Sequence, residues 1–327
     1  MTSTNELPVG EPGEREAQSR VLAAKSVAGP GIYIIIPTFR EPAHVAALLS
    51  DLRQQSWQAF SVVVINSDPG DATSRLLARG RAGRGVVELT ADPSVYWSGA
   101  IEIGQRWVLD RAGPEDLVMF LNADIRLSSD FLERIARLLP PLGRTMVAPA
   151  TVAGGSFVSS GCRVVSWPLA LTRHVLVGRC RPVGSTLMPV DMLAGRALCF
   201  PARALREVGL VAARQLPHYH SDYEYTARAH RQRYCLYVVP DLQVWNDVEH
   251  TGIKSSNPHS TLWQRLRGLA SIKSSANLKY RTRFVLLTYP RYSLPSALFI
   301  NWMKAFLEIS FGETPYRLFT LRGTTER

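Results

Sequence analysis

Three short apolar runs, each ending in polar residues, constrain the fold of this chain more than any other feature. The runs and the residues that follow them are Ile32–Ile36 with Pro37-Thr38, Val62–Ile65 with Asn66-Ser67-Asp68, and Leu117–Leu121 with Asn122-Ala123-Asp124. Their length and their β-branched content are typical of strands buried on both faces. Helical patterns lie between the runs, so strands and helices alternate. This order favours a parallel sheet with right-handed crossovers.

The polar residues after the third run predict a ligand site. In a parallel sheet, ligands bind at the carboxyl ends of the strands, so Asn122 and Asp124 would stand at the mouth of such a site. A carboxylate and an amide oxygen suit a hard divalent cation. An Asx-type turn that caps the strand, with Ser128-Ser129-Asp130 starting the next helix, accounts for the same residues equally well.

The remaining patterns extend the alternation and divide the chain. Helices are expected at about 42–55, 72–78, 100–111, 129–139, 202–207 and 222–233, and further strands at 86–89, 145–150, 190–201 and 234–239. Residues 151–190 suggest antiparallel hairpins or an inserted segment. Residues 1–28, rich in Glu, Ser, Pro and Gly, predict a flexible leader. One domain is expected over 29–255, with halves meeting near residue 150, followed by a helical extension over 256–327.

Composition narrows the class of protein. The chain has 327 residues, of which 46% are hydrophobic, and a formal net charge of +11. Such a charge attracts anions, but no zinc-finger, helix-turn-helix or clustered basic-aromatic pattern supports nucleic acid as the partner. The four cysteines lack disulfide-scaffold density and indicate free thiols in a reducing compartment. No secretory signal or membrane span is expected.

The motifs together resemble the signatures of family 2 inverting glycosyltransferases over about residues 31–252. The residues that carry the resemblance are, in order, Ile34–Arg40, Val62–Asp68, Trp97–Ala100, Phe120–Asp124, Gly195, Ser221–Glu224 and His250. The closest branch is the rhamnosyltransferase-like one that builds bacterial cell-surface polysaccharide. The implied fold is the GT-A type, an α/β, Rossmann-like and mostly parallel sheet flanked by helices, with a small mixed acceptor-side sheet and C-terminal helices.

The resemblance assigns roles to individual residues. It implies a nucleoside-diphosphate sugar donor, and a glycan or lipid-linked acceptor. Asp124 would hold Mn²⁺ or Mg²⁺, aided by Asn122 and His250, and Asp222 would be the general base, with Glu224 as the alternative base or an acceptor contact. Donor contacts are expected from Thr38, Glu41, Asp68, Trp97, Gly99, Asn122 and Arg228. Arg231 is a further candidate for phosphate or acceptor contact. Plain structural roles, such as an N-cap for Asp222 or a basic helix face for Arg228, remain open.

Three departures from the family pattern affect the expected site. Arg40 stands where asparagine is common, Asn122 replaces the first acid of the DxD motif, and Ser221 replaces the glutamate of the usual Glu-Asp pair. They leave the metal affinity and the donor identity open. A nucleotidyltransferase is the second hypothesis. It would need a Gly-rich basic loop after the first strand, which this chain lacks. A non-catalytic basic protein that binds membrane or nucleic acid is the third reading.

The C-terminal region suggests where the protein acts. Residues 294–309 combine apolar and aromatic residues near several arginines, which suits a helix lying on an anionic membrane surface. A dimer interface or packing on the core explains the pattern equally well, so a homo-oligomer stays open. The expected location is the cytoplasm, with contact at the inner face of the plasma membrane.

Overall fold

A computed structural model describes residues 29–78, 85–177, 187–246, 269, 271–272, 274 and 277–311. The strands are β1 Ile32–Thr38, β2 Phe60–Asn66, β3 Val86–Thr90, β4 Leu117–Phe120, β5 Ile125–Arg126, β6 Thr145–Ala153, β7 Ser156–Val158, β8 Gly161–Ser166, β9 Leu171–His174, β10 Met188–Pro189, β11 Met192–Leu193, β12 Leu198–Pro201 and β13 Cys235–Asn246. The α-helices are α2 Pro42–Arg53, α3 Ala72–Leu76, α4 Tyr96–Leu109, α5 Phe131–Leu138, α6 Arg203–Glu207, α7 Ser221–Arg231, α9 Leu278–Thr288 and α10 Leu294–Phe311.

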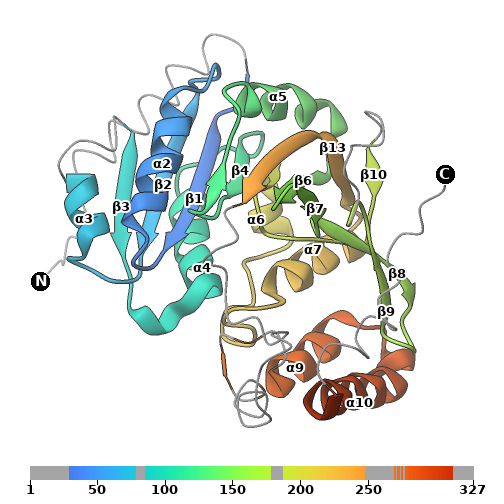
Figure 1. Cartoon of the computed structure of the whole chain (residues 1–327). Coiled ribbons are helices and arrows are strands. Elements are labelled where there is room, and N and C mark those ends of the chain that lie inside the picture. The colour runs from blue at the N-terminus through green and yellow to red at the C-terminus, as the bar shows by residue number, and fades with distance from the viewer. Residues whose placement is uncertain are drawn as a thin grey trace, which may run out of the picture.

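A large, mostly parallel sheet forms the centre of the molecule (Figure 1). Its main path runs β10-β13-β6-β12-β4-β1-β2-β3, with β5 and β7 paired at its side. Strands β1, β2, β3 and β4 are parallel, as are β6 and β13, whereas β12 is antiparallel to both β4 and β6. A second sheet, β11-β8-β9, is antiparallel throughout rather than mixed.

Strand β1 is buried along its whole length, because both faces of the sheet are covered. Ile34 and Ile36 belong to a buried cluster that includes side chains of α2 and α5. Tyr33 and Ile35 belong to the cluster on the other face, with side chains of α4, α6 and α7. Alternating side chains of one strand therefore support two layers of helices.

Two predicted elements differ from the structure near the cavity described below. Helix α4 begins at Tyr96, so Trp97, Ser98 and Gly99 lie in its first turn instead of preceding it. The strand expected over 190–201 is divided into β11 and β12. Ala197, with φ of 52°, takes a left-handed conformation between the two strands and ends regular pairing there. This bend carries Gly195 and Arg196.

The C-terminal helices pack together beside the second sheet (Figure 1). Ala170 of the β8–β9 connection joins Val285 of α9 and Ala297 of α10 in one small buried cluster. Arg231 of α7 donates hydrogen bonds to the carbonyl oxygens of Thr288 and Leu287, at 2.8 and 3.1 Å. The structure thus gives Arg231 two backbone partners at the end of α9.

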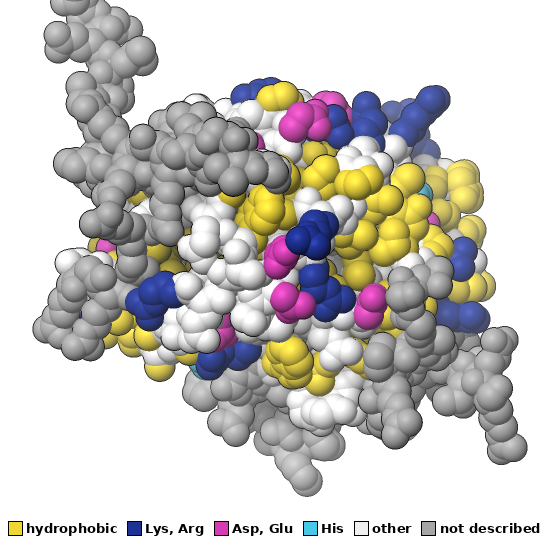
Figure 2. Space-filling view, turned by 90° about the horizontal axis from the view of Figure 1, so that it is seen from above, with side chains coloured by type: hydrophobic (Ala, Val, Ile, Leu, Met, Phe, Trp, Pro, Cys, Tyr) yellow, Lys and Arg dark blue, Asp and Glu magenta, His cyan; other side chains and the backbone are white. Residues whose placement is uncertain are grey.

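Charges of both signs share the molecular surface. Figure 2 shows acidic and basic side chains next to each other among hydrophobic ones. The structure also contains ion pairs such as Arg126 with Asp51 and Arg137 with Glu133. The net positive charge is therefore not gathered into one basic patch on the face that Figure 2 displays. In the described part of the chain, no helix has the length and apolar character needed to cross a membrane.

Candidate functional site

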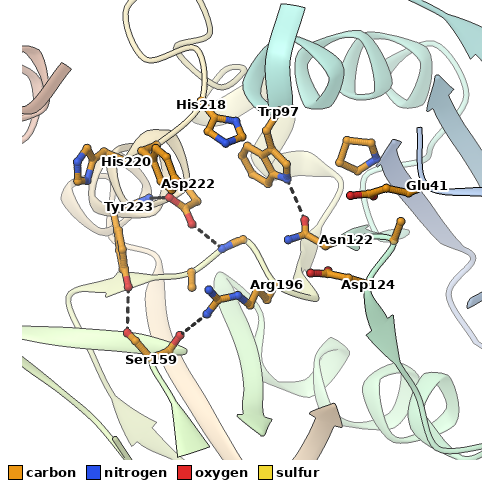
Figure 3. Close-up of a pocket in the computed structure, with 15 residues that line it drawn as sticks. Glu41, Trp97, Asn122, Asp124, Ser159, Arg196, His218, His220, Asp222 and Tyr223 are labelled. Atoms are coloured by element: carbon orange, nitrogen blue, oxygen red, sulfur yellow. Dashed lines mark hydrogen bonds between the residues drawn. The ribbon is translucent and has the colours of Figure 1, made fainter. Parts of the chain in front are cut away.

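A cavity of about 480 Å³ lies at the carboxyl ends of β1 and β4. Its lining comes from six segments distant in sequence: Pro37 and Glu41; Trp97; Asn122, Ala123 and Asp124; Ser159; Ala194, Gly195 and Arg196; and His218, Tyr219, His220, Asp222 and Tyr223. Figure 3 shows these side chains around the opening. The tertiary fold thus brings together five of the predicted site residues, namely Glu41, Trp97, Asn122, Asp124 and Asp222.

Asp124 lines the cavity and is buried there. Its side chain is 8% exposed, and its Oδ1 atom has no hydrogen-bond partner among the described residues. Burial raises the pKa of this carboxyl, while a hydrogen bond with the Asn246 side chain and the nearby Arg196 guanidinium act in the opposite direction. Asn122, two residues earlier, accepts a 2.8 Å hydrogen bond from the indole Nε1 of Trp97 through its Oδ1 atom. The indole therefore fixes the orientation of the amide (Figure 3).

Asp222 lies in the first turn of α7, where backbone groups fix its carboxylate. The Gly195 N–H donates to Oδ2 at 2.8 Å, and the Tyr223 N–H donates to Oδ1 at 2.9 Å. Burial raises the pKa of Asp222, and these hydrogen bonds together with Arg196 oppose that shift. The N-cap of α7 is His220, with φ of 69°, so neither Ser221 nor Asp222 caps the helix. The alternative interpretation of Asp222 as an N-cap is therefore wrong.

Gly195 fits a space that no larger residue could occupy. A Cβ atom there would lie 2.8 Å from the Trp97 ring and 3.3 Å from the Cβ atom of Asp222. A second contact holds the same elements together, since the hydroxyls of Ser98 and Ser221 lie 2.6 Å apart. The start of α4 and the start of α7 are therefore fixed relative to each other.

Arg196 is a cavity residue that the sequence reasoning missed. Its Nη1 donates to the carbonyl oxygen of Ser159 at 3.1 Å, and its charge acts on both Asp124 and Asp222. In Figure 3 the guanidinium lies between Ser159 and Asp124. One feature of the sequence could have identified Arg196: it is a charged residue directly after Gly195 within an apolar segment. His218, Tyr219 and His220 were missed as well, because nothing in their pattern predicts that they face a cavity.

Glu224 and Arg228 do not line this cavity. Glu224 is 3% exposed and accepts hydrogen bonds from Nε and Nη2 of Arg228 at 2.9 and 3.0 Å. Arg228 also donates to the carbonyl oxygens of Val208 and Leu210. Their contacts join α7 to the segment after α6, which indicates a structural role for the pair.

Replacing Glu224 with glutamine is expected to lower the free energy of unfolding by about 3 kcal/mol, because it leaves the partly buried Arg228 without its counter-charge. Urea denaturation measures this loss. The matched control is Glu102→Gln, which breaks an exposed pair with Arg106 at the same helical spacing and should cost about 0.5 kcal/mol or less. Equal losses in the two variants would contradict the structural role of Glu224.

Three further predicted donor contacts lie outside the cavity lining. Thr38 is 4% exposed and its Oγ1 has no hydrogen-bond partner among the described residues. Asp68 pairs with Arg40 at the same edge of the sheet. Gly99 packs tightly in α4, where a Cβ atom would lie 2.8 Å from the Cβ atom of Val95. Helix packing alone therefore explains the glycine.

His250, the predicted third metal ligand, lies outside the described residues. Among the residues that the structure does describe, no three His, Cys, Asp or Glu side chains cluster as a metal site. The buried, unpartnered Oδ1 of Asp124 nevertheless fits one oxygen ligand of a hard cation whose other ligands come from a bound phosphate and water. Cys162, Cys199 and Cys235 are free thiols.

The cavity lies at the edge of a domain with known relatives. Residues 33–163 match the family model described as Glycosyl transferase family 2. No curated protein matches the chain in sequence. Among solved structures, the chain is similar to that of GalNAc-T7 with UDP, GalNAc and Mn²⁺, with 16% identity and a TM-score of 0.55, over 89% of this chain and 58% of that one. The structure of S. aureus TarS 1–349 with UDP matches at 15% identity and a TM-score of 0.48, over 88% and 74%.

The likeness to GalNAc-T7 confirms the predicted fold class. The likeness to GalNAc-T7 extends over most of this chain, whereas this chain spans just over half the length of GalNAc-T7. At this level of identity the shared property is the fold: a mostly parallel sheet, a small antiparallel sheet and C-terminal helices.

Proposed function

Because residues 33–163 match the family model described as Glycosyl transferase family 2, we propose that this protein is a metal-dependent inverting transferase that moves a sugar from a nucleoside diphosphate to an acceptor hydroxyl. The family match supports the predicted enzyme class, a glycosyltransferase. The observation that carries the detailed proposal is that Asp124 and Asp222, from distant segments, line the same cavity.

Asp222 is the general base of this proposal. Its carboxylate takes the proton from the acceptor hydroxyl while the hydroxyl oxygen attacks the anomeric carbon of the donor sugar. The bond from that carbon to the diphosphate breaks, and the nucleoside diphosphate leaves with the bonding electrons. The two backbone hydrogen bonds from Gly195 and Tyr223 orient the carboxylate for this transfer.

Asp124 and Arg196 act on the leaving diphosphate. Asp124 would hold a divalent cation, Mn²⁺ or Mg²⁺, which neutralises the negative charge of the phosphate oxygens when it is bound. Asn122 would assist through its carbonyl oxygen, and His250 remains the proposed additional ligand. Arg196 supplies a second, permanent positive charge to the same cavity.

The donor pocket is proposed to include Glu41, Trp97 and the polar ends of β1 and β2. Thr38 and Asp68 would contact the base or the ribose of the nucleotide, near the cavity rim. UDP is the first nucleotide to test because GalNAc-T7 was solved with UDP. Rhamnose and a cell-surface polysaccharide acceptor are proposed from the sequence resemblance alone.

To test the proposal, the protein is incubated with a panel of nucleotide sugars and Mn²⁺, and release of the nucleoside diphosphate is measured. Thermal unfolding in the presence of each nucleoside diphosphate serves as the binding assay. A bound nucleotide raises the unfolding temperature because it binds only the folded state. Metal-dependent stabilisation by at least one nucleoside diphosphate is expected. Release of pyrophosphate from a nucleoside triphosphate and a sugar phosphate would instead identify a nucleotidyltransferase.

The pH dependence of the reaction should report Asp222. Because burial raises the pKa of this carboxyl above 3.8, the acidic limb of the kcat profile is expected at a higher pH than an ordinary aspartate gives. The folded protein also holds this proton more tightly than the unfolded chain, so Asp222 lowers the free energy of unfolding as pH rises between its unfolded and folded pKa values. The rate profile, and urea denaturation of the Asp222→Asn variant across pH, measure both effects. An acidic limb at the ordinary aspartate pKa would contradict the assignment.

We also propose that α10 rests on the inner face of the plasma membrane. Phe299, Trp302 and Phe306 share one face of this helix and are 66%, 53% and 64% exposed, whereas Lys304 is buried on the other side. Aromatic residues on an exposed face suit the membrane interface, and basic Arg291 at the neighbouring turn suits anionic lipid.

Replacing the three aromatic residues of α10 with serine should lower vesicle binding about tenfold or more, since their apolar area no longer enters the lipid. Co-sedimentation with phosphatidylcholine vesicles containing phosphatidylglycerol measures this, and vesicles of phosphatidylcholine alone serve as the control. Undiminished binding by the triple variant would exclude α10 as the contact. A homo-oligomer remains a prediction, to be tested by light scattering.

A further inference from the structure

Two further cavities follow the main cavity along helix α7. The main cavity shares His220 and Tyr223 with a second cavity of about 140 Å³, which lies between the antiparallel sheet and the C-terminal helices. The second cavity in turn shares Tyr289 with a third cavity, of about 660 Å³. Figure 1 shows α7 above α9 and α10 at this place. Each cavity therefore adjoins the next.

Helix α7 sets the separation between the main cavity and the third one. Asp222 and Tyr223 of its first turn line the main cavity, whereas Ala227, His230 and Arg231 of its later turns line the third. An α-helix rises about 1.5 Å per residue, so Arg231 lies about 13 Å beyond Asp222 along the helix axis. A chain of linked units can reach both places, whereas one small unit at Asp222 cannot.

The third cavity combines aromatic rings with a hydroxyl that has no partner. Trp167 of the β8–β9 connection and Tyr289 both line it, with ring centroids 4.8 Å apart and an interplanar angle of 75°. Thr288 also lines it, is 2% exposed, and has an Oγ1 atom without a hydrogen-bond partner among the described residues. Arg231 donates to the carbonyl oxygen of Thr288 at 2.8 Å and so holds this residue in place. A buried hydroxyl without a partner costs free energy, which a hydrogen bond to a ligand would recover.

The chemistry of the lining suits a neutral ligand with hydroxyl groups. Arg231 and Arg291 line the third cavity together with Asp191, so the lining does not select a simple anion or cation. Asp191 accepts the Val164 N–H at 2.6 Å, and no ligand contact is assigned to it. An acyl or isoprenoid chain would leave the Thr288 hydroxyl unsatisfied. A sugar unit has C–H faces that pack on aromatic rings and hydroxyls that bond to polar side chains, so it matches the lining better.

We propose that the third cavity binds a sugar unit of an acceptor oligosaccharide, away from the unit whose hydroxyl reacts at Asp222. Trp167 packs on the ring of this sugar, and Thr288 hydrogen-bonds to one of its hydroxyls. The volume of about 660 Å³ lies within the range of small-molecule sites, about 300–1,000 Å³. The inference rests on the proposed function, because it takes Asp222 as the base, and it identifies the acceptor as a glycan chain of several units.

The experiment begins with a printed array of bacterial surface glycans, in which each series includes a monosaccharide, a disaccharide and a hexasaccharide. The full chain is applied with saturating UDP and Mn²⁺. The hexasaccharide retained best is then titrated by calorimetry beside the disaccharide of its series. The hexasaccharide should bind about tenfold or more tightly, because only the longer chain occupies the third cavity.

Variants then locate the binding site. Trp167→Ala should remove the advantage of the hexasaccharide, and Trp167→Phe should retain most of it, because an aromatic ring is kept. Thr288→Val removes a hydroxyl without a partner, so it should weaken hexasaccharide binding about fivefold without lowering the unfolding temperature. UDP and disaccharide affinities should stay unchanged in these variants. The matched control is Trp245→Ala, since this residue is 43% exposed and lines none of the three cavities.

The outcomes separate the inference from the proposed function. No retained glycan, equal affinity for the two chain lengths, or an undiminished advantage in Trp167→Ala or Thr288→Val would overturn the inference, while UDP binding leaves the proposed function intact. Displacement of the hexasaccharide by farnesol would identify a lipid pocket and would overturn the inference as well. Failure of UDP to bind the wild type would overturn the proposed function itself.

Discussion

Replacing Asp222 with asparagine is expected to reduce kcat by about 10²- to 10⁴-fold, the usual contribution of a positioned general base. Asparagine has nearly the same shape, and its carbonyl oxygen can still accept the hydrogen bond from the Gly195 N–H. It loses the hydrogen bond from the Tyr223 N–H, because the amide nitrogen cannot accept it, and it loses the ability to accept a proton from the acceptor. UDP affinity is therefore expected to remain unchanged, which calorimetry can verify on the same preparation used for the rate.

The matched control for Asp222 is Asp191→Asn. The carboxylate of Asp191 also accepts a backbone hydrogen bond, from the Val164 N–H at 2.6 Å, but it does not line the main cavity. The control should keep its activity. A fall in kcat of the same size in both variants would show that the loss comes from disturbed packing. Full activity in Asp222→Asn would exclude Asp222 as the base.

Replacing Asp124 with asparagine is expected to remove most of the effect of Mn²⁺ on UDP binding and to lower kcat/KM by about 10²-fold or more, since a cation at the diphosphate contributes several kcal/mol. The reason is the buried Oδ1 atom, which has no hydrogen-bond partner among the described residues and would gain one in a bound cation. Asparagine supplies a neutral carbonyl oxygen in place of the charge. Calorimetric titration of UDP with Mn²⁺ and with EDTA measures the change.

A second buried aspartate provides the control for Asp124. Asp116 is 2% exposed and accepts backbone hydrogen bonds from Gly31 and Gly113, outside the main cavity. Asp116→Asn should lower stability while Mn²⁺ still strengthens UDP binding. If Mn²⁺ strengthens UDP binding equally in the Asp124→Asn variant, Asp124 is not the metal ligand and the proposed assignment fails.

Local sequence was sufficient to predict the elements that lead to the site. The β1 and β4 runs are almost wholly apolar because both faces of the sheet are covered, and their ends are marked by Pro37-Thr38 and Asn122-Ala123-Asp124. Such a signal depends only on neighbouring residues, so it is visible without the fold. The same is true of Asp222 at the start of α7, although its carboxylate accepts backbone hydrogen bonds instead of capping the helix.

Contacts between distant segments could not be predicted in this way. Glu224 and Asp222 are two residues apart, yet Glu224 pairs with Arg228 and Asp222 lines the cavity. Helical rotation separates the two side chains, but only the surrounding elements decide which side faces the cavity. Arg196 was missed for a related reason: its position depends on the bend at Ala197 between β11 and β12.

By itself, the sequence determined the alternation of strands and helices and the polar residues at the strand ends, because hydrophobic periodicity and turn chemistry act over a few neighbouring residues. Only the tertiary structure decided that Asp124, Arg196 and Asp222 meet in one cavity, and that Trp167 and Thr288 line a third cavity farther along α7. Those groupings depend on how the sheets and helices pack across long stretches of chain, where side-chain volume and the pairing of buried charges select the partners.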